Sequence, residues 1–540
     1  MLPIKLVLCN LIYSLIHIKF KDIEDKKMKL QETSIRWALI HIKKEKDTDL
    51  FPTLKEYEIL LENEEYLVNR LKEIEIEEYN WQQYRRFIIP KDEYSYRVAI
   101  QLDPIDNILI VALIYQYGNK IEEKRVPIEE KKVFNYRFKP TSEGNMYDRK
   151  EAWKNFWITS KEKMNQYTFA VYIDIADFYN RIYHHTLENQ LIDCGFENQI
   201  IKSIRRMLQN TTQTVSQGIP IGPHAMHLFA EMCLIPLDEN LLMKGYDYCR
   251  YSDDIIVFVN SESEGQIVIY ELAKVLDSLK LNMQRHKTKI YTKEDFLQKC
   301  NDMLKDNPIS ELEEEMIKII NTYSSDPYAI IGIDNINEVD KEVFSEERIE
   351  NILMSYLTEN KDYQRIRWLF RRLSNVGVDT AINVTIREID NLMPAISDIA
   401  LYFSSIAQES NIVLENIGEK LLGMLKNPII RSNEFLQITI LNLFAKTDKF
   451  NHIARLVEMY NNSSDYIKRE IILAAYSAKQ KSWIRELKQD YNGLGAWGQR
   501  ALLIASELLP KDERRFFLQN VTQNTSGLSS EIIAKIVKDK

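Results

Sequence analysis

The stretch "YCRYSDDIIVFV", residues 248–259, places two adjacent acidic residues directly before an apolar run. The β-branched and aromatic residues that follow Asp253 and Asp254 predict a buried strand. Two neighbouring carboxylates repel each other, and burial makes that repulsion more costly. A divalent cation would relieve it, and Mg²⁺ in particular prefers carboxylate oxygens. The stretch therefore predicts a β-hairpin that carries part of a metal site.

Two earlier blocks complete the pattern. The block "VYIDIADFYNRI", residues 171–182, reads as an apolar strand that ends at Asp174, and "QGIPIGPHAMHLFAEMCLIPLDENL", residues 217–241, reads as a Gly/Pro turn followed by a long apolar helix. Each block alone has an ordinary explanation, because aspartates cap strand ends and Gly/Pro turns start helices. Taken together, the three blocks predict one site in which Asp174 lies beside Asp253 and Asp254.

In this order the blocks resemble motifs A, B and C of reverse transcriptases. The resemblance implies a right-hand polymerase palm in which Asp174 and Asp253 are the main ligands of two Mg²⁺ ions, with Mn²⁺ as an alternative. Asp254 would be the auxiliary carboxylate. The implied activity is that of an RNA-directed DNA polymerase, a nucleotidyltransferase that uses dNTPs.

The same resemblance implies a set of nucleotide contacts. Tyr179 would be the aromatic gate that excludes a ribose 2′-hydroxyl, and Lys287, in "LKLNMQRHKTKI", would lie near the diphosphate leaving group. For the basic residues of this set, an ordinary solvated surface is the alternative. The remaining members line the nascent base pair or grip the triphosphate from the fingers: Gln217, Gly218, Pro220, Lys91 and Arg97.

The expected fold class is α+β, with a fingers–palm domain followed by an all-α domain. Residues 28–140 are predicted to form an N-terminal helical segment and the fingers, and residues 141–300 the palm. Residues 301–540 predict successive amphipathic helices, either HEAT-like repeats or a non-repetitive helical domain. Residues 1–27 are interpreted as an upstream extension before a start at Met28, and an apolar helix packed on the body is the alternative.

The C-terminal helices, together with "FNYRFKP" ahead of Trp153 and Trp157, resemble bacterial abortive-infection and related defence-associated reverse transcriptases. That resemblance implies a cytoplasmic enzyme of anti-phage defence, with a DNA product, an RNA template or none, and an unnamed phage trigger. Two alternatives stay open. One is a polymerase-like scaffold that senses a phage component through its helices, and the other is a retron-like enzyme with a dedicated RNA template.

The composition and several isolated motifs limit which partners and binding sites the sequence allows. A formal charge of −9 argues against a basic nucleic-acid coat but allows a local basic groove, and homo-oligomers are compatible with the sequence. Five scattered cysteines predict free thiols, and the sequence predicts no membrane association. His184 and His185 are interpreted as surface or core-edge residues rather than metal ligands. The basic helix "RIRWLFRR" could hold nucleic acid or simply pack; its candidate contacts are Arg365, Arg367 and Trp368.

Overall fold

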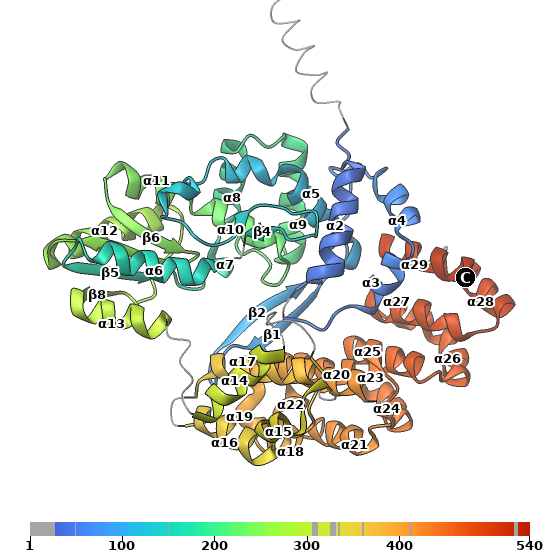
Figure 1. Ribbon diagram of the computed structural model, residues 1–540. Coiled ribbons are helices and arrows are strands. Elements are labelled where there is room, and N and C mark those ends of the chain that lie inside the picture. The colour runs from blue at the N-terminus through green and yellow to red at the C-terminus, as the bar shows by residue number, and fades with distance from the viewer. Residues whose placement is uncertain are drawn as a thin grey trace, which may run out of the picture.

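The computed structural model shows a mixed fingers–palm region and a curved C-terminal array of helices (Figure 1). Of the predicted extension, residues 1–27, only Lys27 lies within the described part of the chain. No helix in the described part is long and apolar enough to cross a membrane. The structure describes residues 27–48, 50–148, 151–304, 311–323, 331–332, 335–358, 361–410, 413–522 and 527–540.

The palm is built on a four-stranded antiparallel sheet. Its strands are β5 (Phe169–Asp174), β6 (Asp247–Tyr251), β7 (Asp254–Val259) and β8 (Lys289–Thr292), in the order β6-β7-β5-β8. The central strands β5 and β7 are apolar at almost every position because helices cover both faces of the sheet. Strand β5 and the β6–β7 hairpin confirm the strands predicted from the sequence.

Different helices cover the two faces of the palm sheet. Helix α12 (Glu262–Ser278) packs on one face, where Gly265 lets it approach Val171 closely. Helices α6 (Ala152–Met164) and α13 (Lys293–Leu304) cover the other face and form a separate apolar cluster with it. Because side chains alternate along a strand, this second face also carries the side chains at the Asp174 end of β5.

The helix predicted over residues 217–241 is broken into two. Helix α10 (Ala225–Cys233) ends at Leu234, and α11 (Ile235–Met243) starts immediately afterwards. Pro236 lies in the first turn of α11, where its missing N–H costs nothing, whereas inside a continuous helix it would remove a backbone hydrogen bond. The single long helix predicted from apolar spacing is therefore wrong.

The fingers consist of helices and one long hairpin. Strands β1 (Arg85–Pro90) and β2 (Tyr96–Gln101) pair in antiparallel fashion, and this hairpin reaches toward the C-terminal helices (Figure 1). Helix α2 (Glu32–Glu45) packs against the apolar helix α5 (Pro104–Glu122). The smaller elements of the fingers and palm are α3 (Lys55–Glu62), α4 (Glu64–Leu71), β3 (Arg137–Phe138), β4 (Tyr147–Asp148), α7 (Phe178–Arg181), α8 (His184–Asp193) and α9 (Asn198–Thr211).

The C-terminal helices form two rows. The inner row packs in succession: α17 (Tyr363–Val376), α20 (Ile396–Glu409), α23 (Glu434–Lys446), α25 (Asp465–Ser477), α27 (Ala496–Ala505) and α29 (Leu528–Asp539). The outer row lies beside it (Figure 1): α16 (Glu346–Tyr356), α18 (Ile382–Arg387), α21 (Glu415–Met424), α24 (Ile453–Met459), α26 (Lys481–Leu487) and α28 (Lys511–Thr522). The predicted all-α region is present, whereas its HEAT-like character stays a prediction because helix lengths and spacing vary.

Buried ion pairs join the C-terminal helices to the N-terminal half. Arg469 of α25 contacts Glu56 at 2.6 Å, and Arg500 of α27 contacts Asp103 at 2.9 Å. All four side chains are buried. Breaking a buried pair leaves an unpaired charge and costs several kcal/mol, about 3–5 in typical cases. The two halves are therefore held together by contacts that tolerate little sliding.

Candidate active site

The β6–β7 hairpin turns in two residues, Ser252 and Asp253, between the paired residues Tyr251 and Asp254. Ser252 adopts a φ of +56°, the left-handed conformation that tight hairpins need at their first loop residue. The guanidinium of Arg250 donates to the Ser252 carbonyl at 3.1 Å. This bond fixes the conformation of the turn, and Asp253 lies at its tip.

Arg250 belongs to a buried network that anchors this hairpin. Its Nε donates to Asp238 at 2.9 Å and its Nη1 to Glu231 at 3.0 Å. Glu231 also accepts from Arg125 and Asn135. All of these side chains are buried, and their mutual hydrogen bonds hold the hairpin against α10 and α11. Arg250 therefore has a structural role, which is to anchor the β6–β7 hairpin.

The three predicted aspartates meet at one end of the sheet. Asp174, the last residue of β5, pairs in register with Asp254, the first residue of β7. The Ile175 N–H donates to the Asp253 carbonyl at 3.3 Å, which brings the hairpin turn beside the end of β5. Asp174 is 6% exposed. The sequence-based expectation that one site unites these residues is thus realised in the backbone.

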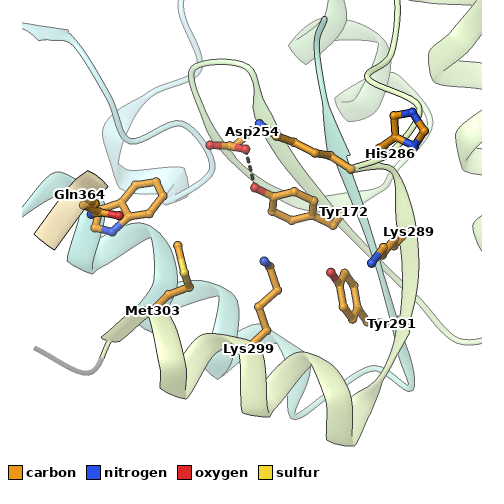
Figure 2. Close-up of a pocket in the computed structure, with 10 residues that line it drawn as sticks. Tyr172, Asp254, His286, Lys289, Tyr291, Lys299, Met303 and Gln364 are labelled. Atoms are coloured by element: carbon orange, nitrogen blue, oxygen red, sulfur yellow. Dashed lines mark hydrogen bonds between the residues drawn. The ribbon is translucent and has the colours of Figure 1, made fainter. Parts of the chain in front are cut away.

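Two further side chains contact these carboxylates. Lys287 Nζ lies 2.6 Å from Asp174 Oδ2. The Tyr172 hydroxyl donates to Asp254 Oδ1 at 2.5 Å (Figure 2). Lys287 comes close because the chain after α12 runs along the end of β5, where the Gln284 N–H donates to the Asp174 carbonyl at 2.7 Å. Each contact offsets part of the negative charge that the hairpin concentrates.

The electrostatics of the site favour a bound cation. Burial, together with the neighbouring charge of Asp254, raises the pKa of Asp253 to about 6. Burial also raises the pKa of Asp254, although its hydrogen bond from Tyr172 opposes the shift. Burial alone would lower the pKa of Lys287, but its bond to Asp174 and the other carboxylates raises it. Ionised carboxylates are thus costly here unless positive charge lies nearby.

The donor set suits hard divalent ions. Asp174, Asp253 and Asp254 offer only oxygen atoms, the ligands that Mg²⁺ and Mn²⁺ take. In the described part of the chain, no three His, Cys, Asp or Glu side chains form a ready-made metal cage. Here Lys287 and Tyr172 engage two of the carboxylates directly. The chemistry of the residues fits such ions, and these contacts are the ones that ion binding would have to displace.

Tyr179, the predicted gate residue, is bonded through its side chain to α10 and through its backbone to the Gly/Pro turn. The Tyr179 hydroxyl lies 2.6 Å from His227 Nδ1 of α10, and the His227 ring stacks on Tyr136 with centroids 4.1 Å apart. The Tyr179 carbonyl accepts from the Ile219 N–H at 3.0 Å, so the Gly/Pro turn is bonded to the gate segment. Tyr179 and this turn therefore form one unit. His227 was not singled out by its sequence context.

The Gly/Pro turn itself has strict backbone requirements. Gly218 adopts a φ of +93°, and its carbonyl accepts from the buried His184 at 2.7 Å. Gly222 adopts a φ of +137°, where a Cβ would lie 2.7 Å from the Ile100 carbonyl of β2. Gln217 bonds the Arg181 carbonyl at 3.3 Å and Pro220 is buried. His184 thus has a supporting role, and the exposed His185 lies outside it.

The predicted fingers contacts lie at the tip of the β1–β2 hairpin, next to the C-terminal helices. Lys91 is exposed, and its carbonyl accepts from Arg367 of α17 at 2.7 Å. Arg97 is half-buried, and burial together with the charge of Arg367 lowers its pKa. Among the residues that the structure describes, Arg97 Nε has no hydrogen-bond partner. Neither residue is brought to the carboxylates by the contacts of this structure, and their contact with a triphosphate stays a prediction.

The basic residues of α17 make protein contacts. Arg365 pairs with Glu313 at 3.0 Å, and Arg367 also donates to the Pro394 carbonyl at 3.0 Å. Trp368 lies under the guanidinium of Arg372, 5.4 Å away. These contacts match the packing alternative for this helix, and nucleic-acid binding by it stays a prediction. The four described cysteines, Cys194, Cys233, Cys249 and Cys300, are free thiols as expected.

Comparison with known proteins identifies the fold of this site. Residues 89–351 match the family of reverse transcriptases, described as RNA-dependent DNA polymerases. The chain therefore contains a reverse transcriptase domain, and all three aspartates lie within it. No curated protein matches the chain.

Two solved structures show distant similarity. Apo telomerase from Candida tropicalis is 12% identical, with 70% of this chain and 68% of that chain covered and a TM-score of 0.32. Telomerase from Candida albicans, in complex with a TWJ fragment of telomeric RNA, is 10% identical, with 71% and 65% covered and a TM-score of 0.29. Similarity at this level carries no conclusion about substrate or partner.

Proposed function

We propose that this protein is a DNA polymerase of the reverse transcriptase type, which adds deoxynucleotides to a hydroxyl group. One observation carries the proposal. Asp174, Asp253 and Asp254 come from the adjoining ends of two neighbouring strands, and Lys287 lies directly beside them. A polymerase needs such a convergence of carboxylates, whereas a scaffold gains nothing from burying groups that repel one another.

Each residue has a distinct task in this proposal. Asp174, Asp253 and Asp254 would hold two Mg²⁺ ions, which supply an activated hydroxyl and neutralise phosphate charge when bound. Lys287, which lies beside Asp174, would donate a proton to the departing diphosphate or stabilise its charge. Tyr179, oriented by His227, would exclude a ribose 2′-hydroxyl by contact.

The biological setting belongs to the same proposal. The resemblance to abortive-infection reverse transcriptases and the C-terminal helical array support a role in anti-phage defence. We place the enzyme in the cytoplasm, with dNTPs as substrates and DNA as product. A phage component acting on the helices would be the trigger. An RNA template, or none, would direct synthesis.

The decisive test replaces Asp253 by Asn in the full chain. Incorporation of labelled dNTPs by the purified protein should fall to background, while Asp277→Asn, on the exposed side of α12, should leave it unchanged. Cells that carry D253N should also lose phage protection. Normal protection by an inactive D253N protein would instead establish the scaffold function.

A second experiment addresses the template. Sequencing the DNA that co-purifies with the protein should give random or homopolymeric sequence if synthesis is untemplated. One defined sequence would indicate a dedicated RNA, as in the retron-like alternative. Both outcomes are compatible with the carboxylate site, because that site acts on the growing end alone.

A further inference from the structure

A pocket of about 630 Å³ opens beside Asp254 on the face of the palm sheet that α6 and α13 cover (Figure 2). The strand β8 contributes Lys289 and Tyr291, and α13 contributes Lys299 and Met303. Trp153 of α6 and Gln364 of α17 close other sides, so the C-terminal helices take part in its wall. This volume lies within the range, about 300–1,000 Å³, of sites that hold small ligands.

The pocket is positively charged in an acidic protein. Its lining holds Lys287, Lys289 and Lys299 against the single carboxylate of Asp254, so the lysines outnumber the carboxylate by three to one. The whole chain carries −9. Concentrated positive charge beside a catalytic carboxylate attracts an anion.

Two of these lysines form no ion pair with the acidic side chains of the described residues. Lys287 is engaged by Asp174, but neither Lys289 nor Lys299 forms an ion pair within the described residues. Lys299 Nζ lies 4.8 Å from the centre of the Tyr172 ring, which itself bonds Asp254. Burial lowers the pKa of Lys299 although the neighbouring charge of Asp254 opposes the shift, so further negative charge beside this ammonium group would stabilise it. An anionic group in the pocket would supply that charge.

The pocket also offers flat apolar surface. Tyr291 and Trp153 are only partly buried, and Met303 is exposed at the rim. Aromatic rings next to lysines are the combination by which proteins bind single-stranded nucleic acid, since bases stack while phosphates pair with the ammonium groups. A diphosphate ion alone would make no use of the rings.

We propose that this pocket binds the single DNA strand whose end is extended, with Lys289 and Lys299 at its phosphates and Tyr291 or Trp153 against a base. The inference rests on the proposed polymerase function and names a partner surface for the same site. Because α6 and α13 cover the sheet beside Tyr172, the strand would reach the carboxylates through the pocket rather than across that face.

The test measures binding, so it does not require activity. The full-length D253N protein is titrated with a fluorescent 12-nucleotide oligodeoxythymidylate, and anisotropy gives the Kd at several salt concentrations. Lys299→Gln and Lys289→Gln should each weaken binding about fivefold and reduce the slope of log Kd against log salt by about 0.7, the contribution of one phosphate contact in a single strand. Tyr291→Ala should weaken binding about tenfold through lost stacking.

The matched control is Lys274→Gln on α12. Lys274 also lies over a tyrosine ring, that of Tyr270 at 5.6 Å, but on the opposite face of the sheet. The affinity of the D253N protein that also carries Lys274→Gln should equal that of D253N alone. Unchanged affinity in both K289Q and K299Q would overturn the proposal. Lys289 is exposed, so its replacement should leave the fold intact. The proposal would also fail if the substitutions weakened only the binding of inorganic diphosphate, measured by its competition with the oligonucleotide. The pocket would then be a site for the leaving group.

Failure of this proposal is distinguishable from failure of the polymerase function. Incorporation of dNTPs by the wild-type protein reports on the polymerase function. The affinity of the inactive D253N protein for the oligonucleotide reports on the pocket. An active wild-type enzyme with unchanged K289Q and K299Q affinities contradicts only the pocket.

Discussion

Lys287 Nζ lies 2.6 Å from Asp174 Oδ2, although 113 positions separate the two residues in the chain. The pair joins the segment after α12 to the end of β5. Lys287 is 55% exposed while Asp174 is buried, so the ammonium closes the carboxylate off from water on one side.

Replacing Lys287 by Met should slow nucleotide addition about a hundredfold. The variant loses both the proton donor and the positive charge beside the departing diphosphate, an effect that typically reaches about 10²–10⁴-fold. Lys287→Arg keeps the charge and should retain more activity. Single-turnover dNTP incorporation measures the rate. Lys244→Met, which removes an exposed lysine paired with Glu271 of α12, is the control, and equal rates in K287M and K244M would remove Lys287 from the chemistry.

Replacing His227 by Ala should weaken the choice between deoxynucleotides and ribonucleotides. His227 holds the Tyr179 hydroxyl at 2.6 Å, and losing one such bond is worth about threefold to tenfold. The ratio of kcat/KM for dATP to that for ATP should fall by this factor, and further in Tyr179→Ala. His185→Ala, an exposed neighbour of the same segment, should keep the wild-type ratio. An unchanged ratio in H227A would mean that Tyr179 is oriented without it.

Replacing Asp238 by Ala should destabilise the protein strongly. Asp238 accepts from Arg250 at 2.9 Å, and both side chains are buried, so the variant leaves an arginine without a main counter-charge. Removing one partner of a buried pair costs about 3–5 kcal/mol. Urea unfolding followed by fluorescence measures the loss. Asp277→Ala on α12 should change the unfolding free energy by less than about 0.5 kcal/mol. A similar small change in D238A would contradict the anchoring role.

Asp47 should make the stability depend on pH. Burial raises the pKa of this carboxyl to about 6, above its ordinary value of 3.8, although its hydrogen bond from Gln101 opposes the shift. The folded protein therefore binds more protons than the unfolded chain between these values. The contribution of Asp47 is intact below about pH 4 and is lost as the pH rises through about 6, by roughly 3 kcal/mol.

The measurement compares the wild-type protein with Asp47→Asn at pH 4 and pH 7. The Asn amide keeps an acceptor for Gln101 but does not titrate. The unfolding free energy of the wild-type protein relative to D47N should therefore drop between the two pH values. A pH-independent difference would show that folding leaves the pKa of Asp47 unshifted, which contradicts the prediction.

The sequence predicted much of the site because its signals are local. Continuous runs of β-branched and aromatic residues define β5 and β7, and carboxylates at strand ends indicate metal chemistry whatever the rest of the fold does. The Gly/Pro turn was recognised in the same way, from its composition, and the structure adds that Gly218 adopts a positive φ. Apolar spacing alone missed the break at Leu234, because α10 and α11 are both buried and only Pro236 marks the boundary.

Other features could be decided only by the tertiary structure. The basic pattern of α17 has the same appearance whether its arginines face nucleic acid or protein carbonyls, and here Arg367 donates to Lys91 and Pro394. In the sequence His227 is only a departure from the usual wording of motif B, and its contact with Tyr179 becomes visible in the fold.

By itself the sequence determined the reverse transcriptase domain and the three aspartates, since strand pattern and residue chemistry are written within a few neighbouring positions. Only the tertiary structure decided which cations and hydroxyls surround those aspartates. Tyr172 reaches Asp254 through the register of β5 and β7, and Lys299 reaches the Tyr172 ring because α13 folds back onto the sheet. Such contacts depend on distances between segments far apart in the chain, which no local pattern encodes.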